Sequence, residues 1–297
     1  MSSKIPDLET AVRMLMPPLN THRFTQLRSG VFESEDIDVM INESGDFAFL
    51  FPQPVMDYSQ YKPRSQRLGL QTYKSNNDVI NRRLQKIGKY LAGVENYLEI
   101  GASDGGFVAM ARNLYPQMHC ACIEPDQSTK QQRDALDWLH QFDDFGAAIS
   151  SGRRFNAIGF FHVFEHIEDP ASFLEQCTAL LAPGGRIIVE VPSLTDPLLG
   201  LYELPAYQKF YFQKQHPYVY SGASLAKVLE HNGLEIQHLI PYQRYGIENH
   251  LTWLSKGKPG GSEDFREQFA HIDDGYRAAL EASATTDTVI AVAGVCP

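Results

Sequence analysis

The sequence predicts an α/β fold whose sheet is mainly parallel. Short apolar runs typical of strands alternate with helical patterns between Tyr97 and Pro192. Strands separated by helices of this length favour a parallel arrangement. The strand runs are apolar throughout rather than alternating, as expected when helices cover both faces of a sheet. A glycine-rich turn at 101–106 joins the first strand to its helix.

The elements follow one another in a regular order. The segment N-Y-L-E-I-G predicts a strand, G-F-V-A-M-A-R-N-L a helix, H-C-A-C-I-E a second strand and S-T-K-Q-Q-R-D-A-L-D-W-L a second helix. A short third strand is expected near H-Q-F-D-D-F, and F-N-A-I-G-F-F-H predicts the fourth. The helix A-S-F-L-E-Q-C-T-A-L-L should stop at Pro183-Gly184-Gly185, before the strand R-I-I-V-E-V-P.

The amino-terminal part divides into two patterns. Residues 1–75 are predicted to be an irregular segment that covers the substrate, with its apolar stretches forming either short strands or an extended arm. The following segment, N-D-V-I-N-R-R-L-Q-K-I-G-K-Y-L, predicts an amphipathic helix. Its two arginines should lie mostly away from the apolar face, which carries Val79, Ile80, Leu84, Ile87 and Leu91.

The carboxyl-terminal part begins with an aromatic-rich loop, about residues 193–221. A helix then follows, with Ser221 as its N-cap and Gly233 at its stop. The runs L-E-I-Q-H-L-I and N-H-L-T-W-L-S predict a closing hairpin-like strand pair, and residues 262–284 a polar amphipathic helix. We therefore expect a main domain over 76–258 and a helical extension over 259–297.

Composition restricts the classes of partner. The formal net charge of −10 would repel a phosphate backbone, so no nucleic-acid partner is expected. No apolar run is long enough to span a bilayer, which predicts no membrane partner. The N-terminus lacks the apolar core of a secretory signal, so a cytoplasmic location is expected.

The four cysteines are Cys120, Cys122, Cys177 and Cys296. Cys120 and Cys122 alternate within a strand pattern and should face the same side of it. No second cysteine pair or spaced histidine pair completes a metal-ligand pattern. Buried reduced thiols are therefore predicted, and no metal site.

The strongest chemical signal is L-E-I-G-A-S-D-G-G-F, residues 98–107, at a strand-to-helix junction. Glycines there let a ligand approach the main chain and point amide N–H groups at it. Glu124 ends the next strand, where a carboxylate can accept both hydroxyls of a ribose. This pair of features alone fits both dinucleotide binders and binders of S-adenosylmethionine (SAM).

Four motifs in order sharpen that choice. L-E-I-G-A-S-D-G-G, C-I-E-P-D, F-N-A-I-G-F-F-H-V-F-E-H-I-E-D-P and L-A-P-G-G-R-I-I-V-E-V-P together resemble the class I SAM-dependent methyltransferase family over residues 95–255. The resemblance implies a Rossmann-like, seven-stranded, mostly parallel sheet with helices on both faces and a terminal antiparallel hairpin. It also implies SAM as cofactor and S-adenosylhomocysteine (SAH) as product.

The resemblance assigns roles to particular positions. Glu99, Gly101 and Gly105 should line the methionine and ribose side of the cofactor, Glu124 should hold the ribose, and His162 should lie beside the transferable methyl group. Asp144 with Phe145 should meet the adenine, although Asp143 remains an alternative to Asp144. The remaining cofactor contacts implied are Ala102, Ser103 and Pro125. The family often has glycine where Ser103 stands.

The acceptor is indicated less directly. G-D-F-A-F-L-F-P-Q-P-V-M-D-Y-S-Q-Y resembles the segment before the SAM domain in sugar C-, N- and O-methyltransferases. Their four-cysteine zinc module has no counterpart, because no cysteine precedes Cys120. We expect a small-molecule acceptor, a hydroxyl of a sugar or polysaccharide precursor, with carbon or nitrogen of a nucleotide-linked sugar as the alternative. A homo-oligomer is left open.

A hydroxyl acceptor calls for a base that titrates near neutral pH, which is the property of histidine. His216, in the aromatic-rich loop, is the leading candidate, and His162 and His166 are alternatives. Tyr218, Tyr220 and Glu165 are the candidate substrate contacts. A structural role for His216 before Pro217, or for His166 in its loop, stays open.

Two functions of other classes remain. A nicotinamide-dependent oxidoreductase would be expected to carry G-x-G-x-x-G, whereas the run here is G-A-S-D-G-G. A non-catalytic SAM-binding subunit would keep the cofactor motifs but would catalyse no methyl transfer.

Overall fold

The computed structural model describes residues 7–54 and 77–295 of the 297-residue chain. Its main sheet has seven strands in the order β10-β11-β8-β7-β4-β5-β6. Strands β4 to β8 run parallel, whereas β11 is antiparallel to both β8 and β10. This confirms the predicted α/β sheet with an antiparallel end. The strands are β4 (Asn96–Ile100), β5 (His119–Ile123), β6 (His140–Phe142), β7 (Phe155–Phe161), β8 (Leu181–Pro192), β10 (Leu234–Tyr242) and β11 (Thr288–Val295).

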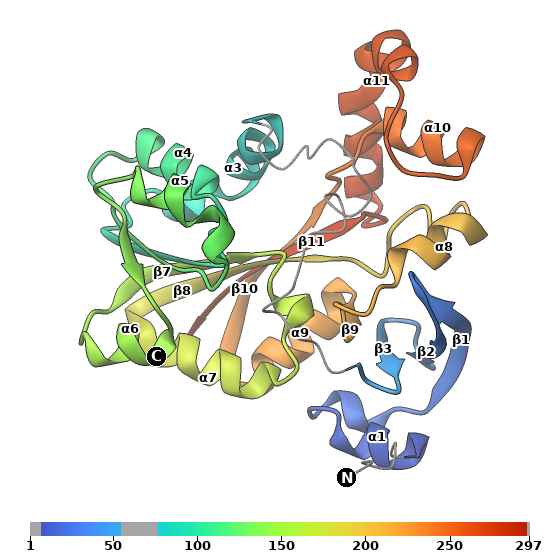
Figure 1. Ribbon diagram of the computed structural model, residues 1–297, viewed down its shortest axis with the longest axis horizontal. Coiled ribbons are helices and arrows are strands. Elements are labelled where there is room, and N and C mark those ends of the chain that lie inside the picture. The colour runs from blue at the N-terminus through green and yellow to red at the C-terminus, as the bar shows by residue number, and fades with distance from the viewer. Residues whose placement is uncertain (1–6, 55–76, 296–297) are drawn as a thin grey trace.

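Helices cover both faces of this sheet (Figure 1). One face carries α3 and α4, and the other carries α6, α7 and α9. Among the described residues, no helix is long and apolar enough to cross a membrane. The helices of the domain are α3 (Asn77–Leu91), α4 (Gly106–Leu114), α5 (Lys130–Asp134), α6 (Phe145–Ser150), α7 (Pro170–Leu180) and α9 (Gly222–His231).

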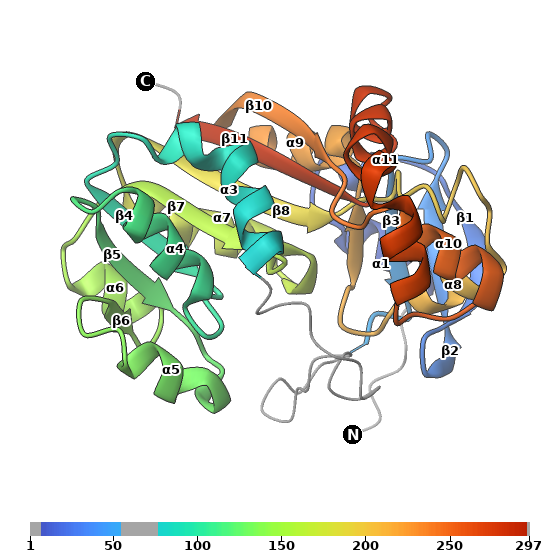
Figure 2. The same ribbon diagram turned by 90° about the horizontal axis from the view of Figure 1, so that it is seen from above.

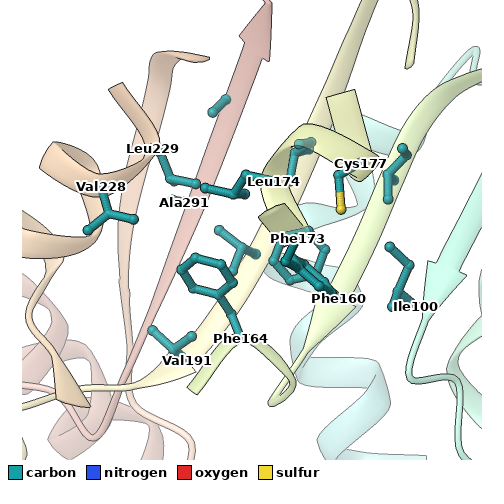
Figure 3. Close-up of a cluster of buried hydrophobic side chains, with 14 of the residues drawn as sticks. Ile100, Phe160, Phe164, Phe173, Leu174, Cys177, Val191, Val228, Leu229 and Ala291 are labelled. Carbon is teal, nitrogen blue, oxygen red and sulfur yellow. The ribbon is translucent and has the colours of Figure 1, made fainter. Parts of the chain in front are cut away.

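The core on the α6–α7–α9 side is built around aromatic rings from β7 and the segment after it. Figure 3 shows Phe160, Phe164 and Phe173 together, between Ile100 on one side and Val191 on the other. Phe173 meets Phe160 edge to face, with ring centroids 5.2 Å apart, a favoured aromatic geometry. Phe164 lies just past the end of β7, so its burial fixes the loop that follows the strand.

The closing antiparallel pair differs from the predicted one. N-H-L-T-W-L-S, expected as a strand, lies within helix α10 (Ile247–Lys256). Thr252 and Trp253 are neighbours and both are buried, which a helix permits and an alternating half-buried strand does not. The partner of β10 is β11, whose apolar run is buried from Thr288 to Gly294, so the main domain extends beyond the predicted boundary at 258. The expected amphipathic helix is confirmed as α11 (Glu263–Ala282).

The amino-terminal segment is more regular than predicted. Helix α1 (Leu8–Met14) precedes three antiparallel strands, β1 (Phe24–Val31), β2 (Ser34–Asn42) and β3 (Phe47–Phe51). The sheet is completed by β9 (Tyr218–Tyr220), which pairs with β3 from the aromatic-rich loop. This second sheet lies beside the main domain (Figure 2). Residues 55–61 of the sugar-methyltransferase-like segment lie outside the described residues.

Both faces of the second sheet contribute buried side chains. One face joins the main core through Phe47, Phe49 and Tyr220. The other face packs its Val39 and Leu50 in a separate cluster with side chains from α8 (Pro205–Tyr211) and α10, including Trp253. The aromatic-rich loop is therefore held between two sheets, with β9 built into the smaller one.

A buried ion pair joins α3 to β8. Arg83 donates two hydrogen bonds to the carboxylate of Glu190, at 2.6 and 2.8 Å. The guanidinium also lies over the ring of Phe161, 4.6 Å from its centroid. Burial raises the pKa of Glu190, but Arg83 outweighs it and holds that pKa below the usual range. The expectation that the two arginines lie mostly away from the apolar face was wrong for Arg83, because Glu190 on β8 is its bidentate partner.

Replacing Arg83 by methionine should cost about 3–5 kcal/mol of unfolding free energy, because Glu190 then loses its bidentate partner while still buried. Urea denaturation would measure it. Its neighbour Arg82 pairs with Asp274, whose side chain is 86% exposed, so Arg82→Met is the matched control. That control should cost less than about 1 kcal/mol. Equal costs for the two variants would contradict a structural role for the buried pair.

The turn after β4 depends on left-handed backbone at Gly101 (φ 75°) and Gly105 (φ 84°). A Cβ added at Gly101 would lie 2.4 Å from Cγ2 of Val163, which follows β7. Only glycine therefore lets the two loops lie in contact. Gly93 has the same φ of 75° with no atom within 4 Å of its added Cβ.

Alanine at Gly93 should cost about 1–2 kcal/mol of unfolding free energy, the price of a left-handed non-glycine residue. Alanine at Gly101 should cost about 1–3 kcal/mol more, because its Cβ also overlaps Val163. Thermal and urea unfolding of both variants would separate the two effects. The double variant Gly101→Ala with Val163→Ala should recover the part that the overlap causes. Equal losses at the two glycines would rule out a tight contact between the loops.

Candidate functional site

The candidate residues meet at one edge of the main sheet. Gly101 follows β4, Glu124 follows β5 and His162 follows β7, and these three strands are parallel neighbours. Their carboxyl ends therefore share an edge, which is where open α/β sheets bind ligands. The contact between Gly101 and Val163 joins two of the loops directly.

The Glu124 carboxylate closes the glycine-rich turn. Its Oε2 accepts the backbone N–H of Ser103 at 2.7 Å, and its Oε1 accepts that of Asp126 at 2.7 Å. The sequence suggested that amides of this turn point at a ligand. The Ser103 N–H is directed at Glu124 instead. Each carboxylate oxygen can accept a further hydrogen bond, and the side chain is only partly buried.

Ser103 occupies a left-handed conformation, with φ 53°. This explains why glycine suits the position, and why a serine here needs support. The support comes from Arg133, a residue that sequence reasoning missed. Its buried guanidinium donates to the Ser103 carbonyl, to Thr129 Oγ1 at 2.6 Å and to the Asp126 carbonyl at 3.1 Å.

Glu99 lies beneath the turn and not on the open edge. Its side chain is buried beneath the turn, close to Arg83 of α3. Burial raises the pKa of Glu99 to about 8, with Arg83 opposing the rise and Glu124 adding to it. Its Oε2 has no hydrogen-bond partner among the residues described. The carboxyl group is therefore poised to gain a donor at the base of the turn.

The predicted adenine contacts lie after β6. Asp144 is the N-cap of α6 and accepts the Ala147 N–H at 2.7 Å, and Phe145 packs edge to face on Phe173. Asp143 is exposed at the strand end. Of the other predicted contacts, Ala102 is buried and Pro125 is exposed.

His162 lies within a network of buried charges. Its Nδ1 lies 3.2 Å from Glu165 Oε1, and its Nε2 lies 3.0 Å from Glu190 Oε1 and in contact with the guanidinium of Arg244. The residue has a left-handed φ of 56°. Both ring nitrogens therefore have partners inside the protein, and the ring ties Glu165 to the Arg83–Glu190 pair.

Glu165, His166 and His216 form a second group, called here the Glu–His cluster. One ligand atom from each of the three residues lies within 4.8 Å of the others. The two imidazole rings meet edge to face with centroids 4.7 Å apart. His166 Nδ1 lies 2.8 Å from the carbonyl of Gln215, and the Gln213 amide lies 3.0 Å from His216 Nε2. The structure thus brings together three residues that the sequence had nominated separately.

The two candidate tyrosines differ in their surroundings. Tyr218 is buried, and its hydroxyl lies 3.2 Å both from Gln53 Nε2 and from the Glu168 carbonyl. Tyr220 is buried and stacks on Phe164, with centroids 5.6 Å apart. Tyr220 is a core residue that links the two sheets.

Sequence reasoning missed the charges that support the site. Glu190 interrupts an apolar strand, and Arg83 lies between apolar residues of its helix. Both positions therefore indicated a buried ion pair. Arg244 follows β10 in a polar stretch and gave no such signal.

Comparison with known proteins shows where this chain belongs. A family model described as "Methyltransferase domain" matches residues 73–239. No curated protein sequence matches the chain. The crystal structure of the plantazolicin methyltransferase BpumL with SAH and a triazolic analogue is similar at a TM-score of 0.51. It is 13% identical, over 78% of this chain and 91% of that one.

A second similar structure is the mitomycin 7-O-methyltransferase MmcR, at a TM-score of 0.50. It is 13% identical, over 80% of this chain and 59% of that one. Likeness at these identities concerns the fold, and the fold agrees with the family match. Because that match spans more than half of the sequence, the chain belongs to the methyltransferase domain family.

Proposed function

We propose that the chain transfers a methyl group from SAM to a hydroxyl of a small molecule, a sugar or polysaccharide precursor. One observation carries the proposal. Val163 lies against Gly101 on one side, and Glu165 and His166 follow it in the same loop. Val163 therefore touches the turn expected to hold the cofactor, and it lies only two and three residues before Glu165 and His166, which we expect near the acceptor.

The residues of the turn fit an adenosyl ligand. At Gly101 the missing Cβ lets the Val163 loop lie directly against the main chain, so the two loops meet at the edge of the sheet where the ligand is expected. Glu124 offers carboxylate lone pairs at the end of β5, the position at which such folds bind ribose hydroxyls. Arg133 fixes the turn from behind, which lowers the cost of ordering it on binding.

SAM supplies an electrophilic methyl carbon on a sulfonium. The acceptor oxygen forms a bond to this carbon as the carbon–sulfur bond breaks, the electron pair stays on sulfur, and the hydroxyl proton leaves. The protein must chiefly align the oxygen with the methyl group, since orientation can supply roughly 7–11 kcal/mol. Removal of the hydroxyl proton is a smaller effect, about 10²- to 10⁴-fold.

The Glu–His cluster is the proposed place of the acceptor hydroxyl. It lies after the carboxyl end of β7 and includes His216 from the segment between α8 and β9, so two separate parts of the chain form it. MmcR, which is similar in fold, is by its name a mitomycin 7-O-methyltransferase. The resemblance of G-D-F-A-F-L-F-P-Q-P, residues 45–54, to the segment before the SAM domain of sugar methyltransferases adds support for a sugar acceptor.

Other functions follow different chemistry. Methylation of carbon or nitrogen on a nucleotide-linked sugar uses the same cofactor site, and the product distinguishes it. A SAM-binding subunit without activity would bind SAH and methylate nothing. A nicotinamide-dependent oxidoreductase is set aside, because the chain belongs to a methyltransferase family.

Label transfer from methyl-labelled SAM to a panel of sugars and sugar nucleotides tests the proposal. The wild type should label at least one hydroxyl compound, and His216→Ala should slow that turnover by about 10²-fold with SAM affinity unchanged. His231→Ala, at the exposed end of α9, is the matched control and should keep wild-type turnover. Labelling of carbon or nitrogen only, or equal rates in both variants, would contradict the proposal.

Glu124→Ala should weaken SAH binding at least about tenfold, because it loses charge-assisted hydrogen bonds of about 1.5–3 kcal/mol each. Isothermal calorimetry on the full chain measures this. Glu175→Ala on the exposed face of α7 removes the same charge away from the site and should bind SAH like the wild type. Unchanged affinity in Glu124→Ala would remove this residue from the cofactor site.

A further inference from the structure

The Glu–His cluster contains one oxygen that the described protein does not satisfy. Glu165 is 2% exposed, and its Oε2 has no hydrogen-bond partner in the described part of the chain. The other oxygen, Oε1, lies 3.2 Å from His162 Nδ1. An unsatisfied buried carboxylate oxygen costs free energy unless a donor or a cation meets it. The cluster therefore has a place for a positively charged or donating group.

The ring of His166 is oriented as a ligand would be. Its Nδ1 lies 2.8 Å from the Gln215 carbonyl, which can only accept a hydrogen bond. The hydrogen must then be on Nδ1, and the lone pair of the neutral ring is on Nε2. A backbone carbonyl that fixes the tautomer in this way is the usual outer partner of a metal-bound histidine.

We propose that Glu165, His166 and His216 bind one divalent transition-metal ion. One ligand atom from each lies within 4.8 Å of the others, with Glu165 buried and both histidines half-buried. A tetrahedral ion about 2.1 Å from each donor would bring the donors to roughly 3.4 Å from one another, a closure of up to about 1.4 Å. The sequence predicted no metal site from its cysteines, and this set uses none.

The donors favour particular metals. Two imidazole nitrogens and one carboxylate oxygen suit Mn²⁺, Fe²⁺, Co²⁺ or Zn²⁺ better than Mg²⁺ or Ca²⁺, which prefer oxygen ligands. Three protein ligands also leave coordination positions for groups from outside the protein. The site is therefore of the kind that takes a substrate oxygen.

A hydrogen-bonded cluster without metal is the simpler alternative. Gln213 and Gln215 do contact the two histidines, and His162 contacts Glu165. These contacts use Oε1 of Glu165 and leave its Oε2 unsatisfied. An ion between the three residues would account for that oxygen.

The role of the ion, unlike its binding, rests on the proposed function. The acceptor's hydroxyl oxygen would be a further ligand, and the cation would make its O–H bond easier to break. The proton is released to water, the oxygen forms its bond to the methyl carbon, and the electron pair of the broken carbon–sulfur bond stays on the sulfur of SAH. The acceptors that fit best offer two adjacent oxygens, such as a vicinal diol.

Titration of the metal-free full chain with Co²⁺, without SAM, tests the site. Calorimetry should give one Co²⁺ ion per chain. Visible absorption should show the d–d bands of Co²⁺ bound by nitrogen and oxygen ligands. Glu165→Gln, His166→Gln and His216→Gln should each weaken Co²⁺ at least about tenfold. His271→Gln on the exposed face of α11 is the matched control and should bind Co²⁺ like the wild type. Equal binding in all four variants, or none in the wild type, would overturn the site.

Chemical protection tests the wild type without any variant. Co²⁺ should protect His166 and His216 from carbethoxylation by diethylpyrocarbonate, while His271 reacts equally with and without the ion. Equal reaction of His166 and His216 in both conditions would overturn the site. SAH calorimetry separates the two proposals: a chain that binds SAH but not Co²⁺ disproves the metal site alone, and one that binds Co²⁺ but not SAH disproves the proposed function alone.

Discussion

The site depends on one buried carboxylate, that of Glu190 in the middle of the main sheet. Moving such a charge out of water costs several kcal/mol, which only close partners can offset. Arg83 from α3 offsets it with two hydrogen bonds, and His162 at the end of β7 adds a contact at 3.0 Å. One acid on β8 thereby fixes a helix on one face of the sheet and a loop at its edge.

That constraint extends along the loop after β7. His162 is held in a left-handed conformation with its ring between Glu190 and Glu165. Phe164, two residues on, is fully buried against Phe173 and Tyr220. With alternate residues tied to the charge network and to the core, Glu165 and His166 have little freedom to leave the edge of the sheet.

The second sheet supplies the other half of the Glu–His cluster. His216 precedes β9, and β9 pairs with β3 from the amino-terminal segment through Phe47 and Tyr220. The amino-terminal segment therefore determines where a residue more than 160 positions later lies. It acts as a structural part of the candidate acceptor site, in addition to any covering role.

The strands, the glycine-rich turn and the carboxylate after β5 could be predicted from the sequence, because each depends on local patterns. Apolar runs, helix stops and left-handed glycines are encoded within a few residues of one another. The same local reasoning failed where partners are distant. The apolar pattern of N-H-L-T-W-L-S is compatible with a helix or a strand. Only the structure shows that it is helical, because Thr288–Val295 pairs with β10 in its place.

The sequence by itself determined the sheet, the sheet edge at which the candidate residues lie, and the identities of the candidate histidines. The tertiary structure decided which of them meet. His162 joined a buried charge network, whereas His166 and His216, fifty residues apart, were brought into contact by β9. Burial and pairing between distant residues depend on how the two sheets pack, and no periodicity within one segment records that packing.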